Sequence, residues 1–124
     1  MEELLTDKCK ADFIVWANKR EPFNFNKYTK TLTCFGKAFF DLPLAFQINA
    51  LCAFADDNQY YVHVEPYLGG GTTAYFASVL YRNKDHIDMQ CDVDNSGHAE
   101  FCTRHEASIE AITEFNKMYN NLID

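Results

Sequence analysis

Phe101-Cys102-Thr103-Arg104-His105-Glu106-Ala107 begins the last apolar periodic run of the chain, and this stretch decides the fold. Thr103 and Glu106 have the spacing of a capping box, in which each side chain accepts a hydrogen bond from the backbone N–H of the other residue. The box predicts a helix over residues 104–121. Its apolar side chains are Ala107, Ile109, Ala111, Ile112, Phe115, Met118, Tyr119 and Leu122, and its polar side consists of Glu106, Glu110, Glu114 and Lys117.

Three strand-like segments precede this helix, and turn residues separate them. Residues 59–67 alternate, with Tyr60, Val62 and Val64 on one face and Tyr61, His63 and Glu65 on the other. Residues 73–82 are rich in aromatic and β-branched side chains, which favour strands. In residues 86–93 we expect Ile87, Met89, Cys91 and Val93 to point inward, and His86, Asp88, Gln90 and Asp92 to point outward.

A turn at Asn95-Ser96-Gly97 leads to a short fourth segment. A three-residue loop with a left-handed Gly97 pairs Val93 with Ala99 and Cys91 with Phe101. This register buries Phe101, whereas a two-residue loop exposes it, so we expect the longer loop.

The N-terminal part predicts two more helices. Thr6 is the expected N-cap of a helix over residues 7–20, with Phe13, Ile14, Trp16 and Ala17 on its apolar face. Asp41 is the expected cap of a second helix over residues 44–55, whose start contains Leu42-Pro43. Its apolar face comprises Leu44, Phe46, Ile48, Ala50, Leu51, Cys52, Phe54 and Ala55. Residues 21–40 leave two structures open, a short hairpin or an ordered loop packed by its aromatic residues.

These elements predict a single α+β domain over residues 1–124. Residues 1–40 supply the N-terminal helix, which we expect at an edge, and the aromatic-rich segment. Residues 41–124 form a three- to four-stranded antiparallel meander with two helices packed on one face. This helix–strand–strand–strand–helix order resembles the double-stranded RNA-binding domain.

The matching position in that family carries lysines that grip phosphates, and here residues 100–107 supply only Arg104 and His105. Three glutamates, Glu100, Glu106 and Glu110, surround them. The charge therefore argues against RNA as the ligand.

The net charge of −7 is unevenly distributed. Residues 1–40 contain seven Lys and Arg against five acids, a balance of +2, and residues 41–124 contain four against thirteen, a balance of −9. An acidic surface repels nucleic acid and favours a basic partner, although it also simply keeps a domain in solution.

The five cysteines are an odd number without a CxxC pair, which indicates reduced structural thiols in a cytoplasmic protein. The acidic start of the chain is unlike a signal peptide, and no apolar run has the length of a membrane span.

Two segments contain residue types that bind metals. Residues 92–100 place oxygen ligands at calcium-loop positions 1, 3, 5 and 9 with Gly97 at position 6, but Thr103 replaces the required Glu at position 12. A hairpin turn uses the same residue types. Cys91, His98, Cys102 and His105 are capable of binding zinc, but their spacing matches no common site. We expect no metal or other cofactor.

Candidates for catalysis and for nucleic-acid binding are also weak. Cys34 is the thiol expected in a loop, but no neighbouring base is indicated, and the chain contains no GxSxG motif. The glycines at 69–71 lack the lysine of a phosphate loop, and His63 and His86 are expected on the surface. Residues 19–40 combine lysines with aromatic rings that could stack on bases, or that could close the core.

Two motifs carry a resemblance to known proteins. Leu42-Pro43, Gln47 and Phe54, followed by Thr103–Ala107, Ala111-Ile112, Phe115-Asn116 and Tyr119-Asn120, resemble small uncharacterised open reading frames of bacteriophages and mobile elements. The resemblance covers residues 42–121. It implies a phage-type α/β sandwich in a bacterial host and supplies no site residues.

The expected function is therefore a small non-enzymatic protein that binds and modulates a host protein with a basic surface. The most specific version of this expectation is inhibition of a nucleic-acid-binding defence protein, in the manner of an anti-CRISPR. The candidate partner-binding residues are Asp88, Asp92, Glu110 and Glu114. A nucleic-acid-binding module at residues 19–40 and an unrecognised enzyme are the alternatives, and the oligomeric state is left open.

Overall fold

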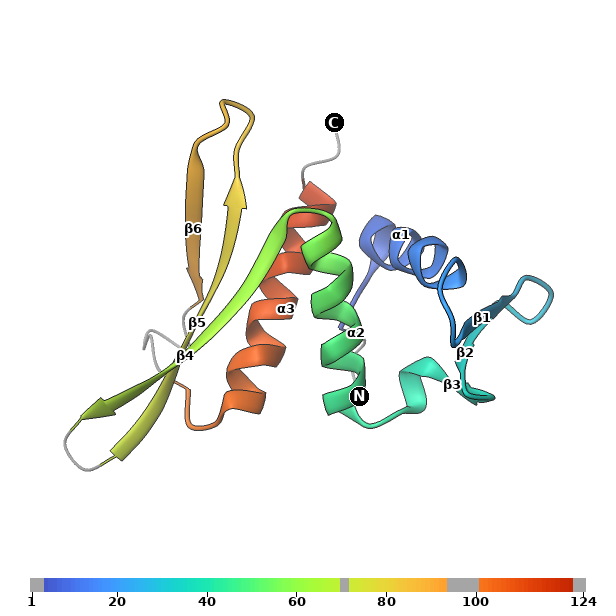
Figure 1. The fold of residues 1–124 in the computed structure, drawn as a ribbon, viewed down its shortest axis with the longest axis horizontal. Coiled ribbons are helices and arrows are strands. Elements are labelled where there is room, and N and C mark those ends of the chain that lie inside the picture. The colour runs from blue at the N-terminus through green and yellow to red at the C-terminus, as the bar shows by residue number, and fades with distance from the viewer. Residues whose placement is uncertain (1–3, 70–71, 94–100, 122–124) are drawn as a thin grey trace.

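The computed structural model describes residues 4–69, 72–93 and 101–121, which form an α+β fold (Figure 1). Its helices are α1 (Asp7–Asn18), α2 (Leu44–Asp57), α3 (Arg104–Asn121) and the short 3-10 helix η1 (Phe39–Asp41). Its strands are β1 (Phe23–Asn26), β2 (Thr31–Cys34), β3 (Lys37–Ala38), β4 (Tyr60–Gly69), β5 (Thr72–Arg82) and β6 (Asp88–Val93). The predicted fold class is confirmed. No helix in the described ranges is long and apolar enough to cross a membrane.

The Thr103 half of the predicted capping box is present at the start of α3. The backbone N–H of Glu106 donates a 3.0 Å hydrogen bond to the Thr103 hydroxyl, and the helix then covers residues 104–121 as expected. Ala107, Ala111, Ile112 and Phe115 are buried along its apolar side. Leu122, which was expected on the same side, lies outside the described residues.

The antiparallel meander β4–β5–β6 is also confirmed, with β5 in the centre. Tyr61 pairs with Leu80, and Leu80 pairs with Gln90. The third strand begins at Asp88, and the prediction that it begins at His86 is wrong. The backbone N–H of His86 donates to the Asn83 carbonyl within a turn, and φ of His86 is +62°, which no strand residue adopts.

Phe101 is buried as predicted, but its predicted pairing with Cys91 is wrong. Phe101 and Tyr75 exchange both backbone hydrogen bonds, at 2.8 and 2.9 Å, while Cys91 pairs with Val79. Phe101 therefore extends the antiparallel pairing along the edge of β5 that β6 also occupies. The turn predicted at residues 95–97 and its partner Ala99 lie outside the described residues.

The helices lie to one side of this sheet (Figure 1). Both α2 and α3 pack against β4, and α3 also packs against β5. The N-terminal helix does not sit at an edge of the sheet as expected. It packs on the far side of the α2–α3 pair, because α1 buries Cys9, Phe13 and Ala17 in the same core as Leu51 and Phe115.

Residues 23–38 form a second small antiparallel sheet, β1–β2–β3, so the hairpin alternative is correct. Leu32 and Cys34 are buried beneath it. Cys34 pairs with Lys37 across a two-residue turn formed by Phe35 and Gly36, whose φ angles are +55° and +79°. Turns with two positive φ angles join twisted strands most easily.

The starts of α1 and α2 differ from their predicted caps. Thr6 occupies the N-cap position of α1, but its side chain makes no capping hydrogen bond; Asn120 of α3 instead accepts from the Cys9 N–H at 2.8 Å. Asp41 belongs to η1 and is not the cap of α2, whose N-cap position is Pro43. Buried Gln47 reaches back from α2 and donates to the carbonyl of Leu42 at 2.8 Å.

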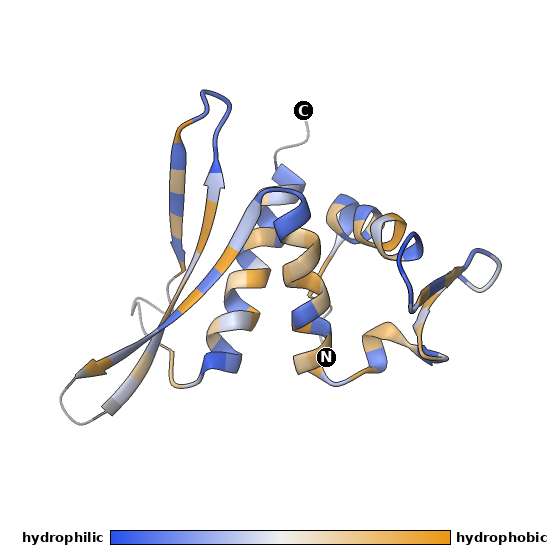
Figure 2. Cartoon of the chain, in the orientation of Figure 1, coloured by the Kyte–Doolittle hydropathy of each residue, from blue (hydrophilic) through white to orange (hydrophobic). Residues whose placement is uncertain are grey.

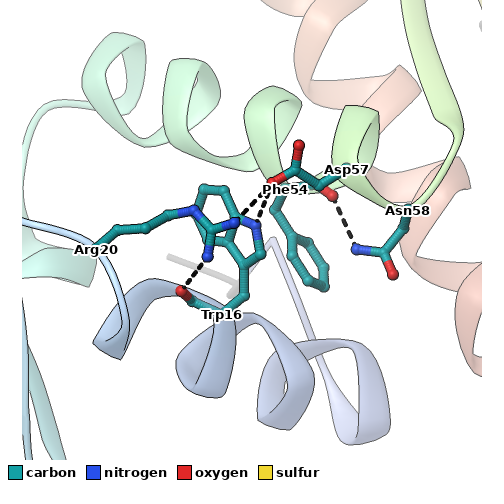
Figure 3. Close-up of polar contacts among 5 residues, drawn as sticks. All are labelled: Trp16, Arg20, Phe54, Asp57 and Asn58. Carbon is teal, nitrogen blue, oxygen red and sulfur yellow. Dashed lines mark hydrogen bonds and ion pairs between the residues drawn. The ribbon is translucent and has the colours of Figure 1, made fainter.

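A polar cluster joins the ends of α1 and α2 (Figure 3). The Trp16 indole N–H donates to the Asp57 carboxylate at 2.7 Å, and the Arg20 guanidinium donates to the same oxygen at 2.9 Å. The guanidinium also stacks over the Trp16 ring, 4.2 Å from its centroid. The two charged groups, the Arg20 guanidinium and the Asp57 carboxylate, are paired with each other. This pairing indicates that the cluster has a structural role.

Candidate functional site

The sheet β4–β5–β6 has one face that the helices do not cover, which we call the outer face. The cross-strand register assigns Tyr61, His63, Glu65 and Tyr67 of β4 to it, opposite Leu80, Ser78, Phe76 and Ala74 of β5. Asp88, Gln90 and Asp92 of β6 complete the rows. The predicted exposure of Tyr61, His63 and Glu65 is confirmed. This face is therefore aromatic and aliphatic near β5 and acidic toward β6.

Two adjoining hollows lie on the outer face. The larger, of about 480 Å³, is lined by residues that include Tyr61, Leu80 and Gln90. The smaller, of about 330 Å³, is lined by residues that include Phe76, Gln90 and Asp92. Gln90 thus stands between the two hollows.

The four predicted partner-binding acids do not form one surface. Asp88 and Asp92 are exposed on the outer face, where Arg82 pairs with Asp88 at 2.9 Å and Gln90 donates to Asp92 at 2.7 Å. Glu114 is half-buried on α3, and the Cys91 thiol donates to its carboxylate at 3.6 Å. Since Cys91 points to the helix side of β6, Glu114 lies on the opposite side of the sheet from Asp92, and exposed Glu110 shares its helix.

The two ends of β6 differ in how deeply their inward side chains are buried. Val93 is buried and Cys91 is half-buried, as expected. Met89 and Ile87 were expected in the core, but they are 40% and 55% exposed. The end of the β5–β6 hairpin reaches beyond α2 and α3 (Figure 2). Alternation therefore assigns these residues to the helix side of a part of the sheet that the described helices do not reach.

One row of the outer face contains residue types that occur in hydrolases. Ser78 pairs with His63 on β4 and with Asp92 on β6. A serine nucleophile needs an imidazole beside it and a carboxylate behind the imidazole. With Asp92 as the carboxylate, the serine separates the other two residues. Glu65 stands in the right order, because its carboxylate oxygen lies 3.5 Å from His63 Nε2. Ser78, however, is only 4% exposed and makes no hydrogen bond to His63, so the described geometry does not provide an activated serine.

The cysteines differ strongly in exposure. Cys34, which was expected in a loop, is buried in β2, and Cys102 is the exposed thiol. Burial, with a smaller contribution from Asp12, raises the pKa of Cys9 to about 12. Burial, with a smaller contribution from Asp56, raises the pKa of Cys52 to about 11. A high pKa keeps both as inert thiols rather than nucleophilic thiolates.

Metal ligands are not brought together in the described residues. No group of three or more His, Cys, Asp or Glu side chains there has the arrangement to hold an ion. Residues 94–100, which contain most of the predicted calcium loop and His98 of the zinc set, lie outside the described part. The segment that leads into the calcium loop is strand β6, whereas an EF-hand requires a helix there.

The aromatic segment at residues 19–40 mostly packs into the core. Phe39 is buried, and Phe23 and Phe25 are half-buried against the same cluster. Tyr28 and Phe35 are 86% and 76% exposed, but they lie in the turns at opposite ends of β2. Two rings separated by the length of a strand do not form one stacking platform, so this geometry does not favour the nucleic-acid alternative.

Sequence reasoning missed the β5 part of the outer face. Both faces of β5 carry apolar residues, with Phe76 and Leu80 on one and Ala77 and Val79 on the other. Alternation therefore could not assign them. The alternation of β4 contained the missing information. Its polar residues mark the exposed face of β4, and the β5 residues that pair with them must lie on the same face.

No family model, curated protein or solved structure matches this chain.

Proposed function

We propose that this chain is a non-enzymatic protein-binding domain that engages its partner through the outer face of β4–β5–β6. The observation that supports the proposal is the composition of that face. Open faces of antiparallel sheets are usually polar. This one has Phe76 and Leu80 half-buried at its centre and Tyr61 48% exposed beside them. Apolar and aromatic residues within a polar rim are typical of protein interfaces.

The charged residues around the apolar centre of the outer face indicate the charge of the partner. Glu65, Asp88 and Asp92 supply three carboxylates against the single guanidinium of Arg82. A surface of this sign attracts a basic protein and repels phosphate backbones. We propose a host protein with a basic surface. Its identification as a nucleic-acid-binding defence protein rests on the acidic charge and on the phage-type resemblance.

Charge-reversal variants test this proposal with a matched control. The tagged wild-type domain and the variants Asp92→Lys and Glu110→Lys are used to capture proteins from bacterial lysate. Both substitutions change the net charge equally, and both positions are exposed, but only Asp92 is on the outer face. We expect Asp92→Lys to lose a protein that the wild type and Glu110→Lys retain. Equal loss in both variants would exclude the outer face as the binding surface.

A further inference from the structure

The outer edge of β6 carries backbone groups that no described residue pairs. The Asn83 N–H donates to the Ile87 carbonyl at 2.9 Å, and Tyr75 exchanges two hydrogen bonds with Phe101. Hydrogen-bonded pairs alternate with non-bonded pairs along an antiparallel ladder, so the odd-numbered residues of β5 bond toward β6. The backbone N–H and C=O groups of Asp88, Gln90 and Asp92 consequently point away from β5.

The other edge of the sheet, at β4, is interrupted by a proline. By the same alternation, even-numbered residues of β4 direct their backbone groups away from β5, and Pro66 is one of them. Proline has no N–H to donate, and proteins use it to prevent strands from adding to an edge. Both α2 and α3 also pack against β4. Among the described strands of this sheet, β6 therefore offers the edge that is open to pairing.

We infer that β6 is a docking edge for an extended segment of a basic partner protein, which adds to the sheet as a further strand. The inference deepens the proposed function and rests on it. Asp88 and Asp92 stand on the outer face of this edge, and Asp92 has no ion-pair partner among the described residues. On the other face, Met89 and Ile87 are exposed next to the same edge. The two faces of β6 therefore match a strand that alternates basic and apolar side chains.

A second copy of this chain fits the edge poorly. If two β6 strands pair antiparallel over their full length with Gln90 at the centre, Asp88 of each copy lies opposite Asp92 of the other. Like charges directly opposite one another destabilise a strand pair. The acids therefore oppose self-association and favour a partner with lysine or arginine at the facing positions.

Peptide probes test the edge without knowledge of the natural partner. The basic probe is the capped peptide Lys-Val-Lys-Val-Lys-Val-Lys, and the control is its counterpart with glutamate in place of lysine. In ¹⁵N spectra of the full chain, we expect the basic peptide to shift and protect the amides of Asp88, Gln90 and Asp92. Shifts confined to other residues, or equal shifts with the acidic peptide, would overturn the inference.

Two variants separate backbone pairing from charge. Gln90→Pro removes the outward N–H of the edge without changing its charge, and we expect roughly tenfold weaker binding of the basic peptide. Gln90→Ala keeps the backbone N–H and removes only the side chain, so we expect it to weaken binding of the basic peptide less than Gln90→Pro does. The double variant Asp88→Lys/Asp92→Lys should reverse the preference to the acidic peptide. Unchanged binding in Gln90→Pro, with native circular dichroism, would show that no strand is added.

The lysate experiment distinguishes the two proposals. If the wild type and Gln90→Pro capture the same protein and Asp92→Lys does not, the outer face binds the partner and the inference of strand addition is wrong. If no variant changes the capture, the proposed function itself is wrong. Loss of capture in both Gln90→Pro and Asp92→Lys, with a smaller effect of Gln90→Ala than of Gln90→Pro, is the result that we expect.

Discussion

The side-chain oxygen of Asn120 lies 2.8 Å from the backbone nitrogen of Cys9, 111 positions earlier in the chain, and caps helix α1. The amide of the same side chain donates to the Thr6 carbonyl at 3.1 Å. One turn earlier on α3, Asn116 accepts from the Thr6 N–H at 2.9 Å. The end of the last helix therefore holds the start of the first.

This arrangement predicts an unequal effect of two neighbouring substitutions. Asn120→Ala removes the cap, which costs about 1 kcal/mol of the free energy of unfolding. Asn121→Ala is the control, since Asn121 is exposed in the same turn and the substitution gains the same helix propensity. Urea unfolding followed by circular dichroism compares the two. A control that is as destabilised as Asn120→Ala would contradict the capping role.

Phe115 anchors the core that α3 shares with α2 and β4. Its ring is fully buried. The ring centroid lies 5.4 Å from that of Tyr60 and 6.0 Å from that of Phe54. We expect Phe115→Ala to cost about 3–5 kcal/mol because it leaves a cavity among these rings. Val15→Ala, at a position 56% exposed on α1, should cost far less. A loss below about 1 kcal/mol at Phe115 in denaturant unfolding would mean that the core is misassigned.

Buried thiols make the fold sensitive to base. The ordinary pKa of a cysteine thiol is 9.0, and burial raises the pKa of Cys9 to about 12. The contribution of Cys9 to stability is complete below pH 9, where both states keep the proton. As the pH rises toward 12, the unfolded chain loses a proton that the folded chain retains, so the free energy of unfolding falls. We expect Cys9→Ala to reduce this fall in urea titrations at a series of pH values. An equal fall in the wild type and Cys9→Ala would contradict this role of the buried thiol.

The β2–β3 turn contains an unfavourable residue. Phe35 adopts φ of +55° although its ring is 76% exposed, so little packing offsets the steric cost. Asparagine tolerates this conformation well and is preferred in such turns. We expect Phe35→Asn to raise the free energy of unfolding by about 0.5–1 kcal/mol, and Phe35→Val, with its β-branch, to lower it. Destabilisation by Phe35→Asn would indicate that the ring has a packing role.

How far the sequence predicts the fold depends on the distance over which each signal acts. The start of helix α3 was predicted to the residue because Thr103 and Glu106 are three positions apart. The cap of α1 was missed because Asn120 is supplied from the far end of the chain. Met89 was assigned to the correct face but wrongly to the core, because alternation does not reveal where a covering helix ends.

The candidate site shows the same limit. Asp88 and Asp92 share a face because they are an even number of residues apart on one strand, and the sequence predicts this. Glu114 was grouped with them by charge alone, and the structure places it beside Cys91 on the other side of the sheet. The register between β4 and β5, which brings Tyr61 next to Leu80, required the three-dimensional structure.

Electrostatic attraction should appear in the kinetics of partner binding. The excess of acids over bases in residues 41–124 predicts that the association rate falls as ionic strength rises and the Debye length shrinks. Charge reversal at Asp92 should slow association more than reversal at Glu110, because only Asp92 lies on the outer face. Stopped-flow rates across a salt series measure both effects. A rate that salt leaves unchanged would reject electrostatic steering.

Carboxyl-group footprinting tests the central claim most directly. Acids of the free domain and of its complex with the captured partner are labelled with a carbodiimide and an amine, and the labelling of each residue is measured by mass spectrometry. We predict that the partner protects Glu65 and Asp92 of the outer face while Glu106 and Glu110 of α3, which are also exposed, keep their labelling. Protection of the α3 glutamates, with Glu65 and Asp92 unchanged, would contradict the account.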